Sequence, residues 1–319
     1  MKPRLVVTRT MPAPVTARIE ATFDPVFLDL QGQFDPETLL EAAETATAIL
    51  VTPADRIDSG LIARLPVGVK ILATFSVGTD HIDLDAARAS GLPIVNTPDV
   101  LSFATAELAL TLMLMAARRA GEGERAARSG QWSGWSPTYL VGTSLEGKTL
   151  GILGMGRIGQ TLARMAQGLS MQVIYHNRNR LPPQQEHNAT HIPDEADFLA
   201  ASDILSIHLP GGAATRHWLN PARLATLRRG AIVINTGRGT TIDDDALIAA
   251  LKSGHVRAAG LDVFAAEPTI PAGYLTLDSV ILLPHLGSAT EETRTAMGML
   301  ALDGIEATLA GEHAPNRVV

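Results

Sequence analysis

One segment, residues 149–168 with the sequence TLGILGMGRIGQTLARMAQG, constrains the fold more than any other part of the chain. The apolar run 150–153 predicts a buried strand, and the apolar residues after it recur at helical spacing. Between strand and helix lies a Gly-x-Gly-x-x-Gly pattern. In this context the glycines permit a tight turn, a close approach of the backbone to a pyrophosphate, and close helix–strand packing. The segment therefore predicts a dinucleotide site at the positive, N-terminal end of a helix.

Composition narrows the class of protein. A chain of 319 residues, 46% hydrophobic and 18% charged, is long enough for two globular domains. Its net charge of −7 argues against nucleic acid as a partner, because a phosphate backbone requires a basic surface. The absence of cysteine removes disulfides and thiolate metal sites. The chain opens without a secretory leader, and its longest apolar stretch, 104–117, is too short to cross a bilayer. We therefore expect a cytoplasmic protein without membrane contact.

Strand-like and helix-like segments alternate along the chain in two stretches. In the first hundred residues we expect strands at 5–8, 48–52, 71–75 and 94–96, and helices at 36–45, 61–65 and 84–90. After the glycine turn we expect strands at 171–176, 204–209, 231–236, 259–264 and 280–283, and helices at 194–200, 221–226 and 243–253. This rhythm predicts an α/β fold with two doubly wound parallel sheets, of which the second, with six strands, is the nucleotide-binding one.

Two helices determine the expected domain organisation. The helix at 103–119 is apolar nearly all round, so it is either a core helix between domains or a helix that a second subunit covers. A polar connection, 121–147, follows it and carries Trp132 and Trp135. No further strand of the second domain follows the last helix, 289–310, so we expect this helix to return to the first domain. The expected domains are 1–99 plus 289–319, and 100–288.

Ligands of open α/β sheets bind beyond the carboxyl ends of the strands. The strand expected to end at His176 is followed by Asn177, Arg178 and Arg180. An NAD-binding domain usually has an acid here for the ribose 2′-hydroxyl, whereas arginine pairs with a 2′-phosphate through charge-assisted hydrogen bonds. NADP(H) is therefore the expected cofactor and NAD(H) the second choice. The alternative interpretation is a solvated basic loop.

Four chemically capable residues follow the later strands. Arg238 lies between two glycines, an arrangement suited to holding a carboxylate. Asp262 and Glu267 come after the fifth strand, and His285 comes after the sixth. Considered alone, His285 is more typical of a structural histidine, and Glu267 of a turn cap. A cation, two acids and a histidine at one sheet edge nevertheless predict a hydride-transfer site.

Several sequence blocks in the same order resemble the D-isomer-specific 2-hydroxyacid dehydrogenases. The blocks are SVGTDHID, NTPDVLSFATAELAL, GMGRIG, NTGRG, GLDVFAAEP and LPHLGSAT, and they span nearly the whole chain. HNRNR and GQWSGW are most similar to the glyoxylate/hydroxypyruvate reductase branch. The resemblance implies a Rossmann NAD(P)-binding domain inserted in a flavodoxin-like substrate domain. It also implies a homodimer that packs through the helix at 103–119.

The resemblance implies catalytic roles for individual residues. Arg238 would bind the substrate carboxylate and polarise its carbonyl, and His285 would be the general acid in reduction. Glu267 would hydrogen-bond His285 and favour its protonated form. The backbone N–H groups of Val77 and Gly78 would bind the carboxylate from the other domain. No metal is expected, because the arginine and the imidazolium supply the positive charge.

The resemblance also implies a set of cofactor contacts. Asp262 would hold the nicotinamide carboxamide, Thr236 and Thr105 would touch the cofactor, and His208 would lie at its adenosine half. The other expected contacts are Gly154, Met155, Gly156, Arg157, Ile158, Gly159, Asn177, Arg178, Arg180 and Gly287. Trp135, with Trp132 as second choice, is the candidate for a side chain that reaches a neighbouring subunit's substrate site. Plain packing is the alternative for both tryptophans.

The sequence therefore predicts an NADPH-preferring reductase that converts small 2-oxo acids, glyoxylate and hydroxypyruvate first, to D-2-hydroxy acids. The departures from the family pattern are the missing acid at Asn177 and the small pair Ala265 and Ala266 before Glu267. Rival enzymes are reductases of bulkier 2-oxo acids and, more distantly, phosphite or formate dehydrogenases. The rival from another class is a non-catalytic NAD(P)-sensing binding protein of the same fold.

Overall fold

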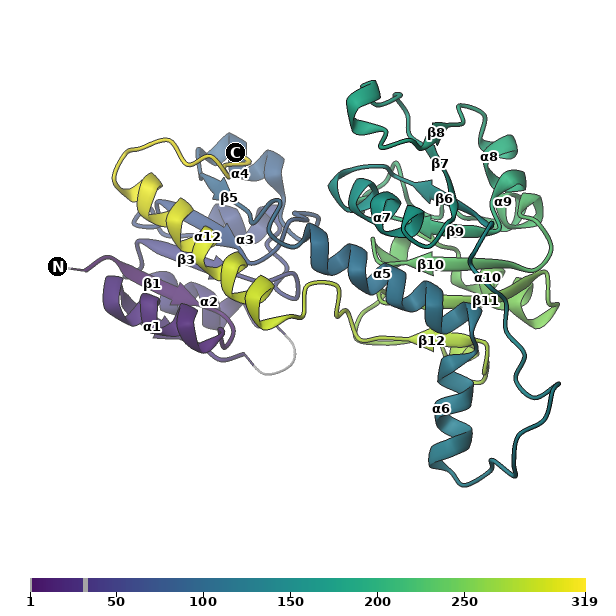
Figure 1. Cartoon of the computed structure of the whole chain (residues 1–319). Helices are drawn as coiled ribbons and strands as arrows, with labels where there is room; N and C mark the ends of the chain where they lie inside the picture. Colours follow the sequence, from purple (N-terminus) through teal and green to yellow (C-terminus); the bar gives the residue numbers. More distant parts are fainter. Residues whose placement is uncertain (1, 31–33) are drawn as a thin grey trace. The chain divides into compact units, whose positions relative to one another are not determined.

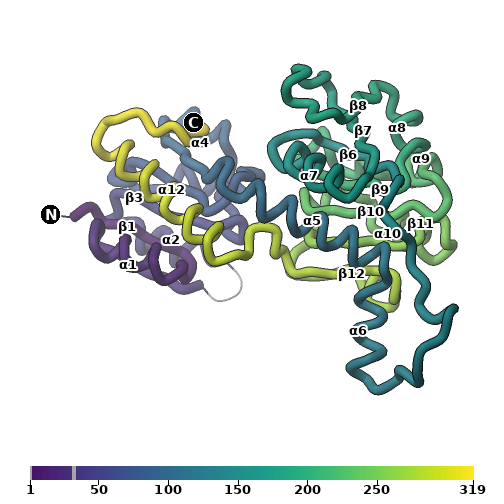
Figure 2. The backbone as a smooth tube through the Cα atoms, viewed as in Figure 1, coloured from purple at the N-terminus to yellow at the C-terminus, as the bar shows by residue number. Residues whose placement is uncertain are grey.

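The computed structural model describes residues 2–30 and 34–319. The chain divides into two compact units, Met1–Leu101 with Ser288–Val319 (unit 1) and Ser102–Gly287 (unit 2) (Figure 1). Each unit has its own parallel sheet and its own hydrophobic core. Figure 2 shows the C-terminal segment, in yellow, returning to the N-terminal part of the chain, so unit 1 is built from two separate stretches.

The sheet of unit 1 has five parallel strands in the order β2-β1-β3-β4-β5. This is the flavodoxin-like order, which reverses direction between β1 and β3. The strands are β1 (Arg4–Val7), β2 (Asp24–Phe27), β3 (Ala48–Val51), β4 (Ile71–Thr74) and β5 (Ile94–Val95). The helices are α1 (Ala13–Thr22), α2 (Pro36–Ala43), α3 (Ser59–Arg64), α4 (Leu84–Ser90) and α12 (Glu291–Leu309).

Alternate residues of the unit 1 strands enter two different cores. Leu5 and Val7 of β1 lie in one core, together with residues of α1 and α12. Val6 lies in the other, with residues of α2, α3 and α4. Successive side chains of a strand point to opposite faces of the sheet. Helices α1 and α12 therefore cover one face of the sheet, and α2, α3 and α4 cover the other. Every residue of β3 and β4 is buried between these layers.

The sheet of unit 2 has seven parallel strands in the order β12-β11-β10-β9-β6-β7-β8. This is the Rossmann order with one added strand, and it reverses direction between β6 and β9. The strands are β6 (Thr149–Leu153), β7 (Gln172–His176), β8 (Thr190–His191), β9 (Ile204–Ile207), β10 (Ala231–Asn235), β11 (Val256–Leu261) and β12 (Val280–Leu282). The two sheets confirm the predicted fold class of a Rossmann domain and a flavodoxin-like domain.

Helices again cover both faces of the unit 2 sheet. They are α5 (Ser102–Ala117), α6 (Ala120–Arg128), α7 (Arg157–Gln167), α8 (Glu195–Ala201), α9 (Pro221–Thr226), α10 (Asp244–Lys252) and α11 (Ala272–Leu275). Residues of α5 and α7 form one core with alternate residues of β6 and β10. Residues of α8, α9 and α10 form the other core with the intervening residues of the central strands.

The predicted strand count of unit 2 was wrong by one. The seventh strand, β8, is a two-residue edge strand, too short to give an apolar run. In unit 1 the prediction missed α1 and β2 for a related reason. The edge strand β2 reads DPVF with no fully buried residue, and α1 buries only Val15 and Ile19. Short edge elements expose much of their surface, so their sequences lack the apolar pattern that marks central strands.

The predicted polar connection 121–147 was also partly wrong, because α6 occupies its beginning. This helix reads AGEGERAAR, contains two glycines and buries no residue. Glycine disfavours a helix interior, so the segment resembles a loop. Surface ion pairs, Arg119 with Glu122 at 2.7 Å and Arg128 with Glu124 at 2.5 Å, accompany the helical turns. The preceding helix accordingly ends at Ala117 rather than at residue 119.

Helix α5 presents two different faces. One face is buried in the core that α5 shares with α7, where Leu112 and Met113 are completely inaccessible. On the rest of its surface Phe103 is 64% exposed and Leu114 is 40% exposed. Within residues 2–30 and 34–319, no helix has the length and apolar character needed to span a bilayer.

Candidate active site

The carboxyl ends of β11 and β12 bring Glu267 and His285 together. The Nδ1 atom of His285 lies 2.8 Å from Oε2 of Glu267, and the backbone N–H of Phe264 donates to Oε1 of Glu267 at 3.0 Å. An ionised carboxylate only accepts, so Nδ1 of His285 carries a hydrogen and Nε2 is the atom left to exchange a proton. The two side chains are 40% and 37% exposed, so the pair remains accessible to a ligand.

The electrostatics of this pair favour an ionised carboxylate. Burial raises the pKa of Glu267, but the hydrogen bond and charge of His285 outweigh burial, with smaller contributions from the Phe264 N–H and the charge of Arg238. The pKa of Glu267 therefore lies below its usual value. A carboxylate that stays ionised orients the imidazole and stabilises its protonated form.

Asp262 fixes the turn that carries His285. The backbone N–H of His285 donates to the carbonyl of Asp262 at 2.9 Å. The next two N–H groups, of Leu286 and Gly287, donate to the two carboxylate oxygens of Asp262 at 2.7 and 2.8 Å. These three bonds hold His285 at φ +55°, a left-handed conformation that is unfavourable for a residue with a Cβ. Asp262 is 1% exposed, and burial raises its pKa.

Arg238 follows β10 and is brought to the same edge by its neighbour Gly239. A Cβ on Gly239 would lie 2.0 Å from the carbonyl carbon of Phe264, so only glycine lets this turn pack against the segment that leads to Glu267. The side chains of Asn235 and Thr241 both donate to the carbonyl of Arg238, at 3.0 and 2.6 Å. The glycine after Arg238 is therefore required by the close packing of two loops.

The glycine turn after β6 has the geometry that a diphosphate requires. Gly154 has φ +90°, and a Cβ there would lie 3.0 Å from the carbonyl oxygen of His208. A Cβ on Gly159 would lie 2.8 Å from the carbonyl oxygen of Gly154, whereas a Cβ on Gly156 would meet nothing within 4 Å. Gly156 precedes α7, and the N–H groups in the first turn of a helix have no partners within that helix. Open space beside such N–H groups fits an anionic dinucleotide.

The basic segment after β7 divides into residues with different roles. The side-chain oxygen of Asn177 accepts the backbone N–H of Met155 at 2.7 Å and so ties this segment to the glycine turn. Arg178 is exposed and forms no hydrogen bond or ion pair with any described residue. Arg180 instead donates Nε and Nη2 to the carboxylate of Glu186 at 2.8 and 3.1 Å. Of the two arginines predicted to bind a 2′-phosphate, Arg180 is therefore held by the carboxylate of Glu186.

Three further residues expected to touch the cofactor, His208, Thr236 and Thr105, stabilise the same edge. The ring of His208 lies 2.9 Å from Oγ of Ser206 and 3.4 Å from Oγ1 of Thr236. Burial lowers the pKa of His208 to about 4, so the ring is neutral at neutral pH. Thr105 of α5 donates to the carbonyl of Gly287 at 3.1 Å and links the long helix to the His285 turn.

In unit 1 the loop after β4 contains Val77 and Gly78, and both of their carbonyl groups are bound. Oγ of Ser76 donates to the carbonyl of Gly78 at 2.6 Å, and Nδ2 of Asn96 donates to the carbonyl of Val77 at 2.8 Å. The N–H groups of Val77 and Gly78 donate no hydrogen bond to the described residues. Neither Ser76 nor Asn96 was predicted from the sequence to belong to the site, although they lie in the blocks SVGTDHID and NTPDVLSFATAELAL.

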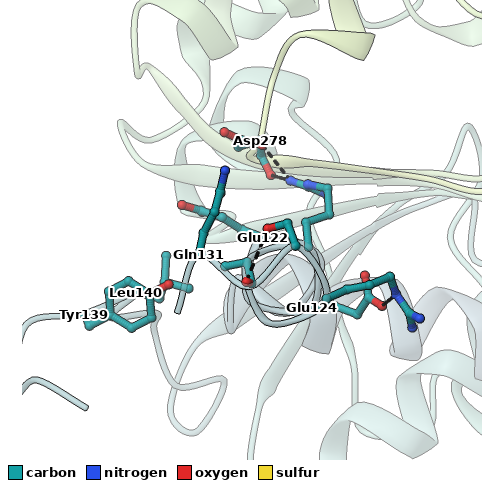
Figure 3. Close-up of a pocket in the computed structure, with 10 residues that line it drawn as sticks. Glu122, Glu124, Gln131, Tyr139, Leu140 and Asp278 are labelled. Carbon is teal, nitrogen blue, oxygen red and sulfur yellow. Dashed lines mark hydrogen bonds and ion pairs between the residues drawn. The ribbon is translucent and has the colours of Figure 1, made fainter. Parts of the chain in front are cut away.

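The segment that carries the tryptophans is largely exposed. Trp135 is 84% exposed and Trp132 is 58% exposed. Figure 3 shows a nearby pocket bounded by α6, by Tyr139 and Leu140, and by Asp278, whose carboxylate binds Arg125 at 2.9 Å. Arg238, Glu267 and His285 do not line this pocket, so it is separate from the candidate active site.

Comparison with known proteins assigns the family. The family model for the D-isomer specific 2-hydroxyacid dehydrogenase NAD binding domain matches residues 110–287. Glycerate dehydrogenase from Hyphomicrobium methylovorum is 39% identical over 312 residues, 97% of each chain. Glyoxylate reductase from Thermococcus litoralis is 39% identical over 100% of this chain and 97% of its own.

A solved structure supports the same assignment. An NADPH-dependent glyoxylate/hydroxypyruvate reductase from Sinorhizobium meliloti, in complex with NADP and malonate, matches with a TM-score of 0.90 at 33% identity. The match covers 100% of this chain and 97% of that chain. The chain therefore belongs to the D-isomer-specific 2-hydroxyacid dehydrogenase family and resembles its glyoxylate/hydroxypyruvate reductase branch.

Proposed function

We propose that the protein is an NADPH-preferring reductase of small 2-oxo acids, glyoxylate and hydroxypyruvate first, and that it yields D-2-hydroxy acids. The observation that carries the proposal is the hydrogen bond of 2.8 Å between His285 and Glu267 in a sheet edge shared with Arg238. The names of the glyoxylate reductases and of the glycerate dehydrogenase among its relatives support the substrate class.

In the proposed reaction, side chains of this protein bind the substrate carboxylate and transfer the proton. Arg238 binds the substrate carboxylate and draws electron density from the adjacent carbonyl. Nε2 of His285 donates a proton to the carbonyl oxygen, and in the reverse direction it takes that proton from the hydroxyl. Glu267 keeps the imidazole oriented while its charge changes. A bound nicotinamide supplies the hydride that reduces the carbonyl carbon.

We assign the binding of the cofactor to the edge of the unit 2 sheet, which makes unit 2 the NAD(P)-binding domain. The glycine turn and the first turn of α7 would bind the diphosphate, including the N–H groups of Arg157 and Ile158, and Met155 would contact the cofactor as part of the same turn. Arg178 would bind the 2′-phosphate. Thr105, His208, Thr236, Asp262 and Gly287 would line the remainder of the cofactor site.

Unit 1 would be the substrate domain. The N–H groups of Val77 and Gly78 would bind the substrate carboxylate, as two donors suited to an anion. The exposed apolar residues of α5 support a homodimer through this helix, with Trp135 reaching the neighbouring subunit. Sedimentation of the purified protein tests the dimer, and a monomer at micromolar concentration would contradict it.

The test of the proposed function is a matched set of initial rates. NADPH and NADH are each assayed with glyoxylate, hydroxypyruvate, pyruvate and phenylpyruvate. We expect the highest kcat/KM with NADPH and the first two acids, and a D-configured product from hydroxypyruvate. A preference for phenylpyruvate would indicate a reductase of bulkier acids, and a preference for NADH would remove the role of Arg178. Tight binding of both cofactors without turnover would identify a sensor instead.

A further inference from the structure

Glu186 is a nearly buried carboxylate to which the proposed mechanism gives no part. It follows the short helical turn Pro183–Gln185, and its side chain is only 11% exposed. Three hydrogen bonds reach it: Nε and Nη2 of Arg180 donate at 2.8 and 3.1 Å, and the hydroxyl of Tyr175 donates at 2.7 Å. A carboxylate in this position requires the guanidinium, because an unpaired buried charge is strongly destabilising.

Tyr175 connects this pair to the sheet. It lies in β7, is completely buried, and its hydroxyl oxygen accepts the backbone N–H of Leu181 at 3.0 Å. The cluster of Tyr175, Arg180 and Glu186 therefore fixes the Leu181 end of the segment that begins at Asn177, while the Asn177 end is held by the backbone N–H of Met155. Arg178 lies inside that segment, with its side chain exposed.

The two arginines consequently differ in what they offer an anion. Both oxygens of Glu186 accept from Arg180, so the Nε–Nη2 edge of Arg180, one of its two edges that can bind a phosphate through two hydrogen bonds, is engaged by a carboxylate. A phosphate that used this edge would have to displace the pairing and leave Glu186 buried beside Tyr175, and a phosphate at the other edge would meet a guanidinium whose charge is already paired. Arg178 forms no ion pair with a described residue, so a phosphate that binds it displaces no carboxylate.

We propose that Glu186 sets the strength of selection for NADPH over NADH by holding Arg180 in an ion pair, so that Arg178 binds the 2′-phosphate and Arg180 positions the segment around it. This inference rests on the NADPH preference proposed above. It predicts a selectivity below that of a site with two available arginines, and it makes Glu186 a residue through which that selectivity can be increased.

A set of four variants tests the proposal, with the ratio of kcat/KM for NADPH to that for NADH as the readout. Arg178→Met should lower the ratio about tenfold or more, since a charged hydrogen bond to phosphate is lost. Arg180→Met should lower it by clearly less than Arg178→Met does, because Arg180 only positions the segment. Glu186→Gln keeps an acceptor for Tyr175 but releases Arg180, and should raise the ratio about threefold or more. The double variant Arg180→Met with Glu186→Gln should lose that gain.

Urea unfolding of the same variants measures the contribution of the ion pair to stability in the absence of any cofactor. Arg180→Met should lower the unfolding midpoint, and adding Glu186→Gln should restore part of it, because the unpaired charge is then removed. Arg180→Lys, which keeps a cation, serves if the Met variant does not fold. An effect of Arg180→Met on the ratio as large as that of Arg178→Met, or no gain with Glu186→Gln, would overturn the proposal.

The two proposals fail in different ways. If the wild-type protein has the higher kcat/KM with NADH, the proposed NADPH preference is wrong, whatever the unfolding data show. If Arg178→Met acts on NADPH alone while Arg180 and Glu186 show no coupling in unfolding, the preference stands and the role assigned to Glu186 is wrong.

Discussion

The two sheets of this protein share one topological feature, a point at which the order of parallel strands reverses, and they use it differently. In unit 2 the reversal lies between β6 and β9, and in unit 1 between β1 and β3. Such reversals leave a crevice beyond the strand ends where ligands commonly bind. In unit 2 the residues at this point are Gly154 and Gly156, and a Cβ on Gly156 would meet open space.

In unit 1 the corresponding strand ends carry a buried ion pair. The carboxylate of Asp55 is completely inaccessible, and it binds Nη2 of Arg9 at 2.8 Å. It also accepts from the hydroxyl of Thr8 at 2.6 Å and from the backbone N–H of Thr52 at 2.8 Å. The same topology therefore leaves open space where glycines keep the backbone accessible, and forms a buried ion pair where charged side chains lie at the strand ends.

The largest expected effect concerns the chemistry at the unit 2 edge. Replacing His285 by Ala should lower kcat by about 10²–10⁴-fold, the usual contribution of a general acid. Equilibrium binding of NADPH should change little, because the glycine turn lies at another strand. The exposed His313 of unit 1, replaced by Ala, is the control and should leave kcat unchanged. Retention of more than a tenth of the wild-type kcat in the His285 variant would contradict the assignment.

The next effect tests whether the filled crevice of unit 1 is structural. Replacing Asp55 by Ala should lower the free energy of unfolding by about 3 kcal/mol, because Arg9 then loses its buried partner. The surface pair of Asp85 and Arg88 provides the control, and Asp85→Ala should cost at most about 0.5 kcal/mol.

The tryptophans allow the two units to be followed separately during this experiment. All three, at 132, 135 and 218, belong to unit 2. Urea unfolding of the Asp55 variant should therefore shift further by circular dichroism than by tryptophan fluorescence. If instead cofactor affinity fell and stability did not, the Asp55 cluster would be part of a ligand site.

A glycine substitution tests the open crevice of unit 2. Gly156→Val should fold normally, because a Cβ has room there and the backbone is extended at φ −80°. It should weaken binding of both NADPH and NADH by about 10–100-fold, since the side chain occupies the diphosphate position. Gly156→Ala should give a smaller loss of the same kind. Unchanged affinity with a normal melting temperature would place the diphosphate elsewhere.

A smaller effect is expected at the loop of unit 1 that contains Val77 and Gly78. Asn96→Ala removes the donor to the Val77 carbonyl and should raise the KM for glyoxylate about 3–10-fold. The dissociation constant for NADPH should not change, because Asn96 belongs to unit 1 and the proposed cofactor contacts belong to unit 2. A change in kcat with KM unaffected would argue that the loop acts in a step other than binding.

The smallest effect concerns the ion pair of unit 2, which lies beside the crevice rather than in it. Hydrogen bonds from Arg180 and Tyr175 lower the pKa of Glu186 from 4.5 to about 2. A lowered pKa in the folded state contributes stability that is complete above pH 4.5 and is lost as the pH falls towards 2.

The difference in urea midpoint between the wild type and Glu186→Gln should therefore be constant above pH 5 and shrink between pH 4.5 and 3. Glu44→Gln, at an exposed position, is the control and should show a much smaller pH dependence. A difference that stays constant down to pH 3 would mean that Glu186 is not held as an ion pair.

Much of the fold could be predicted from the sequence because its signals are local. The central strands are continuous apolar runs, and the glycine turn combines strand, spacing and helix within twenty residues, 149–168. The positions of Arg238, Glu267 and His285 at strand ends follow from the same pattern, since parallel strands bring their carboxyl ends to one edge. The pairing of His285 with Glu267 came instead from the family resemblance, since nothing in the spacing of the two residues requires it.

Other features depended on contacts that no local pattern records. Edge strands β2 and β8 are short and exposed, and α6 contains glycines, so none of them carries the periodicity of a core element. The partner of Arg180 could not be predicted either. Glu186 lies six residues away in a polar loop, and no local pattern indicates that its carboxylate is buried against Tyr175.

The sequence by itself determined the fold class and the positions of the central strands, because burial of apolar runs and the conformational freedom of glycine act over a few residues. Only the tertiary structure decided which charged side chains would be available to a ligand. Arg178 and Arg180 are the same residue type two positions apart and both are exposed, yet only Arg180 is bound by Glu186. The difference arises because an ion pair depends on the three-dimensional position of its partner, which sequence spacing alone does not specify.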